Sequence, residues 1–158
     1  MNIQSTMMNR SFKEIREIQD KLVRVESPPI FELLFLNFKA SINRKSFTLA
    51  VIESFQALES FLENYLISRY REKGVSEKDI ESILNQKWRA KERLKDLLKS
   101  VSGHSLSENG MLWDTWCTAN DKRNKMIHET KEIDLSDAEK AIKANRDVVQ
   151  WIKSLPSQ

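Results

Sequence analysis

The apolar residues of this chain recur at steps of three and four positions, which is the spacing of one face of an α-helix. The clearest stripe is formed by Val51, Phe55, Leu58, Leu62 and Tyr65. No segment alternates apolar and polar residues over a sustained run, as a half-buried strand would. The pattern therefore predicts an all-α fold, an up-down helical bundle of four to five main helices joined by short connections.

Two prolines at 28–29 divide the chain. Before them, a weaker helical stripe over 12–25 predicts an N-terminal helical appendage, residues 1–26. After them comes the bundle, residues 27–158. Its first helix, from Ile30 to Phe38, is apolar over most of its surface, so it is expected to be buried between other helices or in an interface.

Capping residues indicate where the later helices begin and end. Gly74 suits the left-handed C-cap of the long helix. Ser76 is expected to cap a helix whose apolar stripe runs on to Val101. The last helix is expected to begin with a capping box at Ser136-Asp137-Ala138-Glu139 and to end before Pro156.

Composition narrows the class of protein. At 158 residues, with 40% hydrophobic and 31% charged positions, the chain has the composition of one soluble globular domain. Its single cysteine excludes an internal disulfide and a cysteine-based zinc site, and favours a reducing, cytoplasmic setting. The first residues lack the order of a signal peptide, and no apolar stretch is long enough to span a membrane. We expect a cytoplasmic protein without membrane association.

The charge balance permits nucleic-acid binding without requiring it. Lysine and arginine number 26 against 23 acidic residues, a formal net charge of +3. A basic run from Lys87 to Lys99 is interleaved with Glu92 and Asp96, so it is expected to be a solvated helix face, with an RNA-guiding patch as the alternative. The four tryptophans are expected to be core or interface anchors, with a base-stacking platform as the less favoured alternative. They are Trp88, Trp113, Trp116 and Trp151.

One cluster carries candidate chemistry. The chain lacks a phosphate loop, a nucleophile elbow, a His-Glu-x-x-His pair and a dinucleotide-binding turn, and we expect neither a metal nor a cofactor. Residues 121–129, however, combine Arg123, Asn124 and His128. A guanidinium suits a phosphate, and an imidazole exchanges protons near neutral pH. Together they supply what a metal-independent ribonuclease needs, a proton acceptor for the 2′-hydroxyl and a stabiliser of the crowded phosphate.

Helical geometry complicates this cluster. Asn124 and His128 are one turn apart on the same face, whereas Arg123 lies about 140° around the helix from His128. Arg123 must therefore curl round, or the helix must loosen, for both to serve one site. The structural alternatives are a helix-terminal role for His128 and a surface ion pair of Arg123 with Asp121 or Glu129.

The pattern Arg123-Asn124-x-x-x-His128 resembles the signature of the HEPN superfamily, the higher eukaryotes and prokaryotes nucleotide-binding domains. In that superfamily the motif lies at the end of a late helix. An Ala57-Leu58-Glu59 element on a long early helix and a final helix that begins near 135–139 agree with the resemblance. It covers roughly residues 28–155.

The resemblance implies a four- or five-helix up-down bundle that forms a two-fold homodimer. Many such proteins are metal-independent endoribonucleases, acting as toxins of toxin–antitoxin pairs or in antiviral defence. In the implied cleft between two copies, Arg123 would hold the scissile phosphate, His128 would be the general base or acid, and Asn124 would orient the substrate or the imidazole. Attack by the 2′-hydroxyl would restrict cleavage to RNA and leave a 2′,3′-cyclic phosphate.

Further residues enter as binding candidates. The resemblance implies that Glu59 pairs with Arg123 across the bundle, and the cations Lys122 and Lys125 would extend the contact with RNA. The expected partners are RNA, a second copy of the chain and an antitoxin or other partner protein. Because other relatives in the superfamily do not catalyse, the alternative is a helical module that binds a partner protein or a nucleotide.

Overall fold

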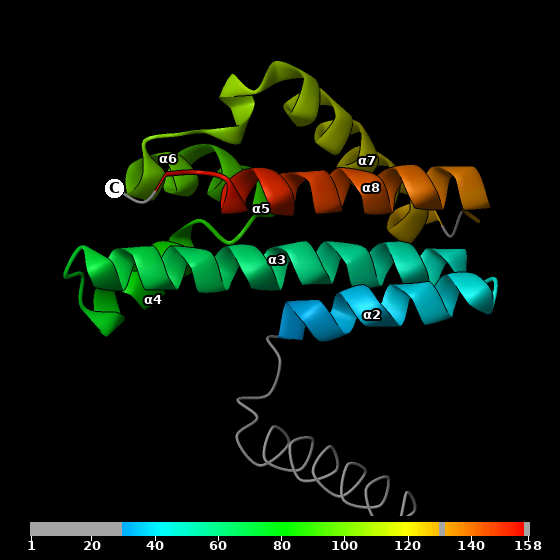
Figure 1. The fold of residues 1–158 in the computed structure, drawn as a ribbon, viewed down its shortest axis with the longest axis horizontal. Helices are drawn as coiled ribbons and strands as arrows, with labels where there is room; N and C mark the ends of the chain where they lie inside the picture. Colours follow the sequence, from blue (N-terminus) through cyan, green and yellow to red (C-terminus); the bar gives the residue numbers. More distant parts are fainter. Residues whose placement is uncertain (1–29, 130–131, 157–158) are drawn as a thin grey trace, which may run out of the picture.

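The computed structural model describes residues 30–129 and 132–156, and every regular element in these ranges is helical. The main helices are α2 (Ile30–Asn43), α3 (Phe47–Glu72), α4 (Glu77–Gln86), α7 (Gly110–Glu129) and α8 (Leu135–Lys153) (Figure 1). Between α4 and α7 lie α5 (Ala90–Glu92), the π-helical η1 (Arg93–Leu97), α6 (Leu98–Ser102) and the 3-10 helix η2 (Leu106–Glu108). The all-α prediction is confirmed, whereas the expected helix over 12–25 and the appendage 1–26 lie outside the described residues.

The long helix α3 is the centre of the bundle and packs against α2, α6 and α8. Most of its predicted stripe is fully buried, and each such side chain contributes about 1.5–3 kcal/mol through burial. The interface with α2 includes an edge-to-face contact between Phe31 and Phe61, with ring centroids 5.1 Å apart. On α2 itself, Phe38 is buried among the other helices and Leu33 is 42% exposed, so the alternative of an interface stays a prediction for the exposed side of this helix. None of the described helices is long and apolar enough to cross a membrane.

The helix α8 runs in the same direction as α3. Asn145 donates a hydrogen bond from Nδ2 to Ser54 Oγ (2.9 Å), and Arg69 donates from Nη2 to the Pro156 carbonyl (3.3 Å). Residue numbers therefore rise together along both helices, as the colours in Figure 1 also show. In a strict up-down bundle of the five expected helices, the second and the fifth would run in opposite directions.

The segment after α3 accounts for this difference, because it turns back on itself. Its contacts along α3 are, in chain order, Glu77 with Arg71, Arg93 with Glu63 and Ser100 with Tyr70, at 2.6, 2.7 and 2.8 Å. The chain thus returns along α3 through α4 and then reverses through η1 and α6. The prediction of one helix reaching Val101 is wrong, since residues 87–89 break it.

Caps fix the helix ends, with one correction to the sequence analysis. Gly74 has a φ of 76°, the left-handed conformation that favours glycine, and the Ser76 hydroxyl accepts the Asp79 amide, both as predicted. The cap of α8, however, is Asp134, whose carboxylate accepts the Asp137 amide at 2.8 Å. The predicted start at Ser136 is therefore wrong by two residues. An aspartate caps as well as a serine, and its charge also favours the helix N-terminus.

A polar chain crosses the core between α7, α8 and α3. The Trp116 indole donates to Asn145 Oδ1 (3.1 Å), and Asn145 donates in turn to Ser54. All three residues are completely buried. Trp116 is thus the core anchor that the sequence predicts, whereas Trp88 is 67% exposed and the prediction of a core position for it is wrong. The break at 87–89 removes Trp88 from the helical stripe.

Candidate functional site

The guanidinium of Arg123, on α7, faces α3. Its Cζ lies 5.3 Å from the centroid of the Phe55 ring, and its Nη2 lies 3.7 Å from Glu59 Oε1. On its own helix, Nη1 donates to Asn124 Oδ1 at 3.2 Å. Only 23% of the side chain is exposed, and its Nε is buried with no hydrogen-bond partner among the described residues. The guanidinium is therefore held between two helices with part of its donor capacity unused.

Glu59 forms with Arg123 the ion pair that the resemblance implied. Phe55 and Glu59 are one turn apart on α3, which places the ring and the carboxylate against the same guanidinium. Burial raises the pKa of the Glu59 carboxyl, and the attraction of Arg123 and Arg93 offsets this only in part. The separation of 3.7 Å is long for a charge-assisted hydrogen bond, so a phosphate oxygen can compete for the same guanidinium.

His128 lies in the last turn of α7, where its side chain is exposed. In the described part of the chain, no hydrogen bond or ion pair joins this side chain to another residue. Asn124 is one helical turn before it, and the Asn124 amide is engaged by Arg123. A single chain therefore brings Arg123, Asn124 and Glu59 together and leaves His128 on a neighbouring part of the helix surface.

A hollow of about 290 Å³ adjoins Arg123 on the side of α8. Its charged lining includes Lys122, Lys125 and Asp137, and Val51 and Met126 are among the apolar residues of its lining. Lys122 pairs with Asp137 at 2.8 Å, and this hydrogen bond lowers the pKa of the Asp137 carboxyl. Lys125 is exposed and forms no ion pair with another described residue. Of the two lysines named as binding candidates, Lys125 is the one left available to an anion.

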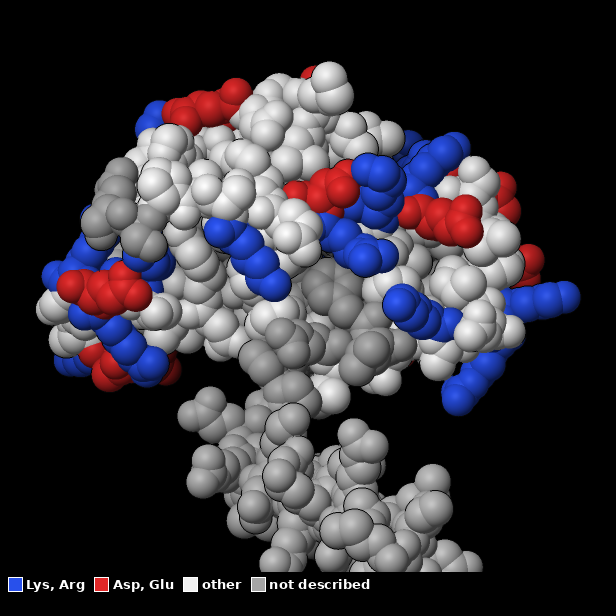
Figure 2. Space-filling model, in the orientation of Figure 1, with Lys and Arg blue, Asp and Glu red and all other residues white. Residues whose placement is uncertain are grey.

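Half of the cations in the basic run from Lys87 to Lys99 are paired with acidic side chains. Three of its cations form the pairs Lys87–Asp96 (3.1 Å), Arg93–Glu63 (2.7 Å) and Lys99–Glu108 (2.6 Å). Figure 2 shows that, on the face formed by α3 and α8, basic side chains also lie among acidic ones. These pairs favour the solvated helix face over the RNA-guiding patch.

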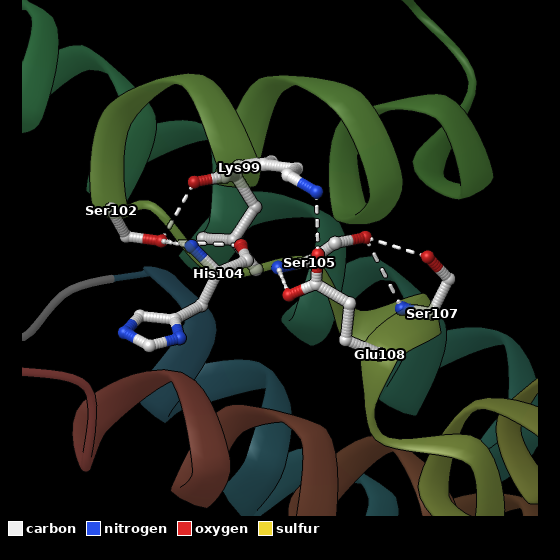
Figure 3. Close-up of polar contacts among 7 residues, drawn as sticks. Lys99, Ser102, His104, Ser105, Ser107 and Glu108 are labelled. Atoms are coloured by element: carbon white, nitrogen blue, oxygen red, sulfur yellow. Dashed lines mark hydrogen bonds and ion pairs between the residues drawn. The ribbon is translucent and has the colours of Figure 1, made fainter.

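The other histidine, His104, belongs to a capped turn between α6 and η2 (Figure 3). Its backbone amide donates to Ser102 Oγ (3.2 Å), and the next residue, Ser105, forms a capping box with Glu108. Lys99 donates to Glu108 at 2.6 Å. The His104 imidazole points away from these contacts (Figure 3). The His104 backbone therefore stabilises the turn, while its imidazole makes none of the polar contacts drawn in Figure 3.

Comparisons with protein-family models, with curated proteins and with solved structures find no match to this chain. Among the described residues, no three histidine, cysteine or acidic side chains gather as metal ligands. The sequence predicted Arg123, Asn124 and Glu59 as site residues, but it did not predict Phe55 as the ring beneath the guanidinium.

Proposed function

We propose that this chain is a metal-independent endoribonuclease of the HEPN type, in which Arg123 binds the scissile phosphate and His128 transfers protons. The observation that carries the proposal is the placement of Arg123. Phe55 and Asn124 hold the guanidinium in position, and its Nε has no partner among the described residues. A cation positioned before the substrate arrives stabilises the developing charge at a phosphate without reorganisation during the reaction.

The proposed reaction needs only groups that this chain supplies. The imidazole of His128 accepts the proton of a ribose 2′-hydroxyl, whose oxygen attacks the adjacent phosphorus. The bond from phosphorus to the 5′-oxygen breaks, and that oxygen leaves with a proton from a histidine or from water. The products are a 2′,3′-cyclic phosphate and a free 5′-hydroxyl. DNA lacks the nucleophile, so it is not cleaved.

The proposed site is completed by a second copy of the chain. Arg123 is turned towards α3 while His128 is exposed, about 140° further around α7, so one chain alone separates the two groups. The start of α3, the end of α7 and the start of α8 each carry an exposed apolar residue. These are Leu49, Ile127 and Leu135, at 48%, 49% and 42% exposure. Such side chains are typical of an interface. We propose a homodimer in which the imidazole of one copy approaches the Arg123 of the other, in a toxin–antitoxin or antiviral defence setting.

The test is RNA cleavage in the presence of EDTA, with a panel of structured and unstructured RNAs as substrates. His128→Ala should lower the cleavage rate by at least about a hundredfold, as expected for loss of a general base. The matched control is His104→Ala, which removes the only other histidine of the chain. Equal cleavage by the wild type and His128→Ala would eliminate the assignment.

A second function is a non-catalytic helical module that binds a partner protein or a nucleotide. It is favoured by the observation that the Arg123 guanidinium already pairs with Glu59 and has no bond to His128. This alternative predicts that the wild type cleaves none of the RNAs. It also predicts that Arg123→Ala weakens nucleotide or partner binding while His128→Ala leaves that binding unchanged.

A further inference from the structure

Trp88 is a large aromatic side chain held in solvent by a break in the helical structure. It lies between α4 and α5 and is 67% exposed. The break comes from Lys87, with φ −114° and ψ 61°, and from Arg89, whose backbone is extended. The guanidinium of Arg89 lies over the indole, 5.2 Å from the ring centroid. Trp is usually buried over most of its surface, so this position requires an explanation.

The turn that carries Trp88 is fixed by Arg93. Its Nε donates to the Lys87 carbonyl (2.8 Å) and its Nη2 to the Leu84 carbonyl (3.1 Å). Its Nη1 donates to Glu63 on α3 at 2.7 Å, and only 12% of the side chain is exposed. A nearly buried arginine thus ties the end of α4 to α3. Trp88 therefore lies on a turn whose backbone is held in place by these hydrogen bonds. Because the turn is already ordered, less conformational entropy is lost when a ligand binds.

A hollow of about 410 Å³ separates Trp88 from a polar face of α3. That face carries Gln56, Ser60 and Asn64, which recur every four residues and so lie in one row. In the described structure their side chains make no hydrogen bond to another residue. The row offers donors and acceptors opposite an aromatic ring. A nucleobase, which has a flat apolar face and a polar edge, has the matching chemistry.

The charges around this hollow suit a nucleotide as well. Its two carboxylates are engaged, Glu63 by Arg93 and Glu59 by Arg123. Arg89, whose guanidinium lies over the indole, forms no ion pair with another described residue, so its charge can meet a phosphate. Glu59 lines the hollow and also contacts Arg123, so the hollow borders directly on the proposed cleavage site.

We propose that the hollow between Trp88 and the row Gln56, Ser60 and Asn64 is a subsite for one base of single-stranded RNA. The base stacks on the indole and its edge bonds to the polar row. This subsite positions the RNA strand next to Arg123. The inference rests on the proposed ribonuclease function, because it takes RNA as the ligand.

The test is the affinity for a fluorescently labelled single-stranded oligoribonucleotide, measured by anisotropy with the full chain carrying His128→Ala so that cleavage is slow on the timescale of the measurement. Adding Trp88→Ala should weaken binding by about 5- to 150-fold, the range found for losing one stacked base. Trp88→Phe should retain most of the affinity. The matched control is Met111→Ala, which truncates another exposed apolar side chain, 84% exposed on α7.

A second variant tests the opposite wall without altering the aromatic ring. Gln56→Ala, at an exposed position, should also weaken binding, and it should not change the dependence of affinity on salt, because Gln56 contacts neither a phosphate nor Arg89. Unchanged affinity in Trp88→Ala would overturn the subsite, even if RNA cleavage by the wild type upholds the proposed function. A loss of dimer mass in Trp88→Ala, measured by light scattering, would also overturn it, since the indole would then contact protein. Failure of the ribonuclease itself would instead appear as no cleavage by the wild type, or as undiminished cleavage by His128→Ala.

Discussion

The carboxylate of Glu59 on α3 lies 3.7 Å from the guanidinium of Arg123 on α7, and this ion pair joins the two helices that build the candidate site. Partial burial of Glu59, whose side chain is 41% exposed, acts against the pair. It raises the pKa of the Glu59 carboxyl above its ordinary value of 4.5, because the charged form loses hydration that the nearby arginines do not fully replace. The folded protein therefore prefers the protonated form of Glu59 more than the unfolded chain does.

This preference predicts how Glu59→Gln changes stability with pH. A raised carboxyl pKa contributes stability that is present below about pH 4.5 and lost as the pH rises through the folded-state pKa. At pH 7 the neutral glutamine should therefore unfold at a higher urea concentration than the wild type, and the difference should shrink at pH 4. Glu139→Gln, on the exposed side of α8, is the control. Lower stability of Glu59→Gln at pH 7 would mean that the attraction of Arg123 outweighs the cost of burial.

The buried chain of Trp116, Asn145 and Ser54 predicts a large effect of one substitution in the core. Asn145→Ala removes both of its hydrogen bonds and leaves the indole N–H of Trp116 without an acceptor. We expect a loss of about 1–3 kcal/mol in the free energy of unfolding, measured in urea. Gln150→Ala, at an exposed position of the same helix, should change it by less than about 0.5 kcal/mol. Similar values for the two variants would show that the polar chain adds nothing to stability.

The N-terminus of α8 provides a matched pair of substitutions. Asp134→Ala removes the side chain that accepts the Asp137 amide and should cost about 0.5–2 kcal/mol. Ser136→Ala, two residues further on and inside the helix, should be nearly neutral. Thermal or urea unfolding distinguishes them. A larger loss for Ser136→Ala would restore the capping box that the sequence predicted.

The helical class was predictable from the sequence because burial in a helix imposes a period on the apolar residues. The break at residues 87–89 was not, because Ile80, Leu84, Trp88 and Leu94 keep that period across it. The break depends on a tertiary interaction, in which Arg93 binds the carbonyls of Leu84 and Lys87 while pairing with α3. A local pattern contains no information about such a contact.

The candidate site likewise contains residues that the sequence predicts and residues whose role depends on the tertiary fold. Arg123, Asn124 and His128 are close in sequence, so their types and spacing could be read directly. Glu59 lies 64 positions before Arg123 and was named only through the resemblance. The role of Phe55 beneath the guanidinium follows from how α7 crosses α3, which the sequence alone does not specify.

The most direct measurement of the shared site is cleavage by a mixed dimer. Arg123→Ala and His128→Ala should each be inactive alone, whereas co-expressed chains should regain cleavage in the presence of EDTA. If Arg123 of one copy acts with His128 of the other, half of the dimers are mixed and each keeps one intact pair, so about a quarter of the wild-type rate is expected. A mixture no more active than either variant alone, with mixed dimers shown to form, would contradict a site built from two copies.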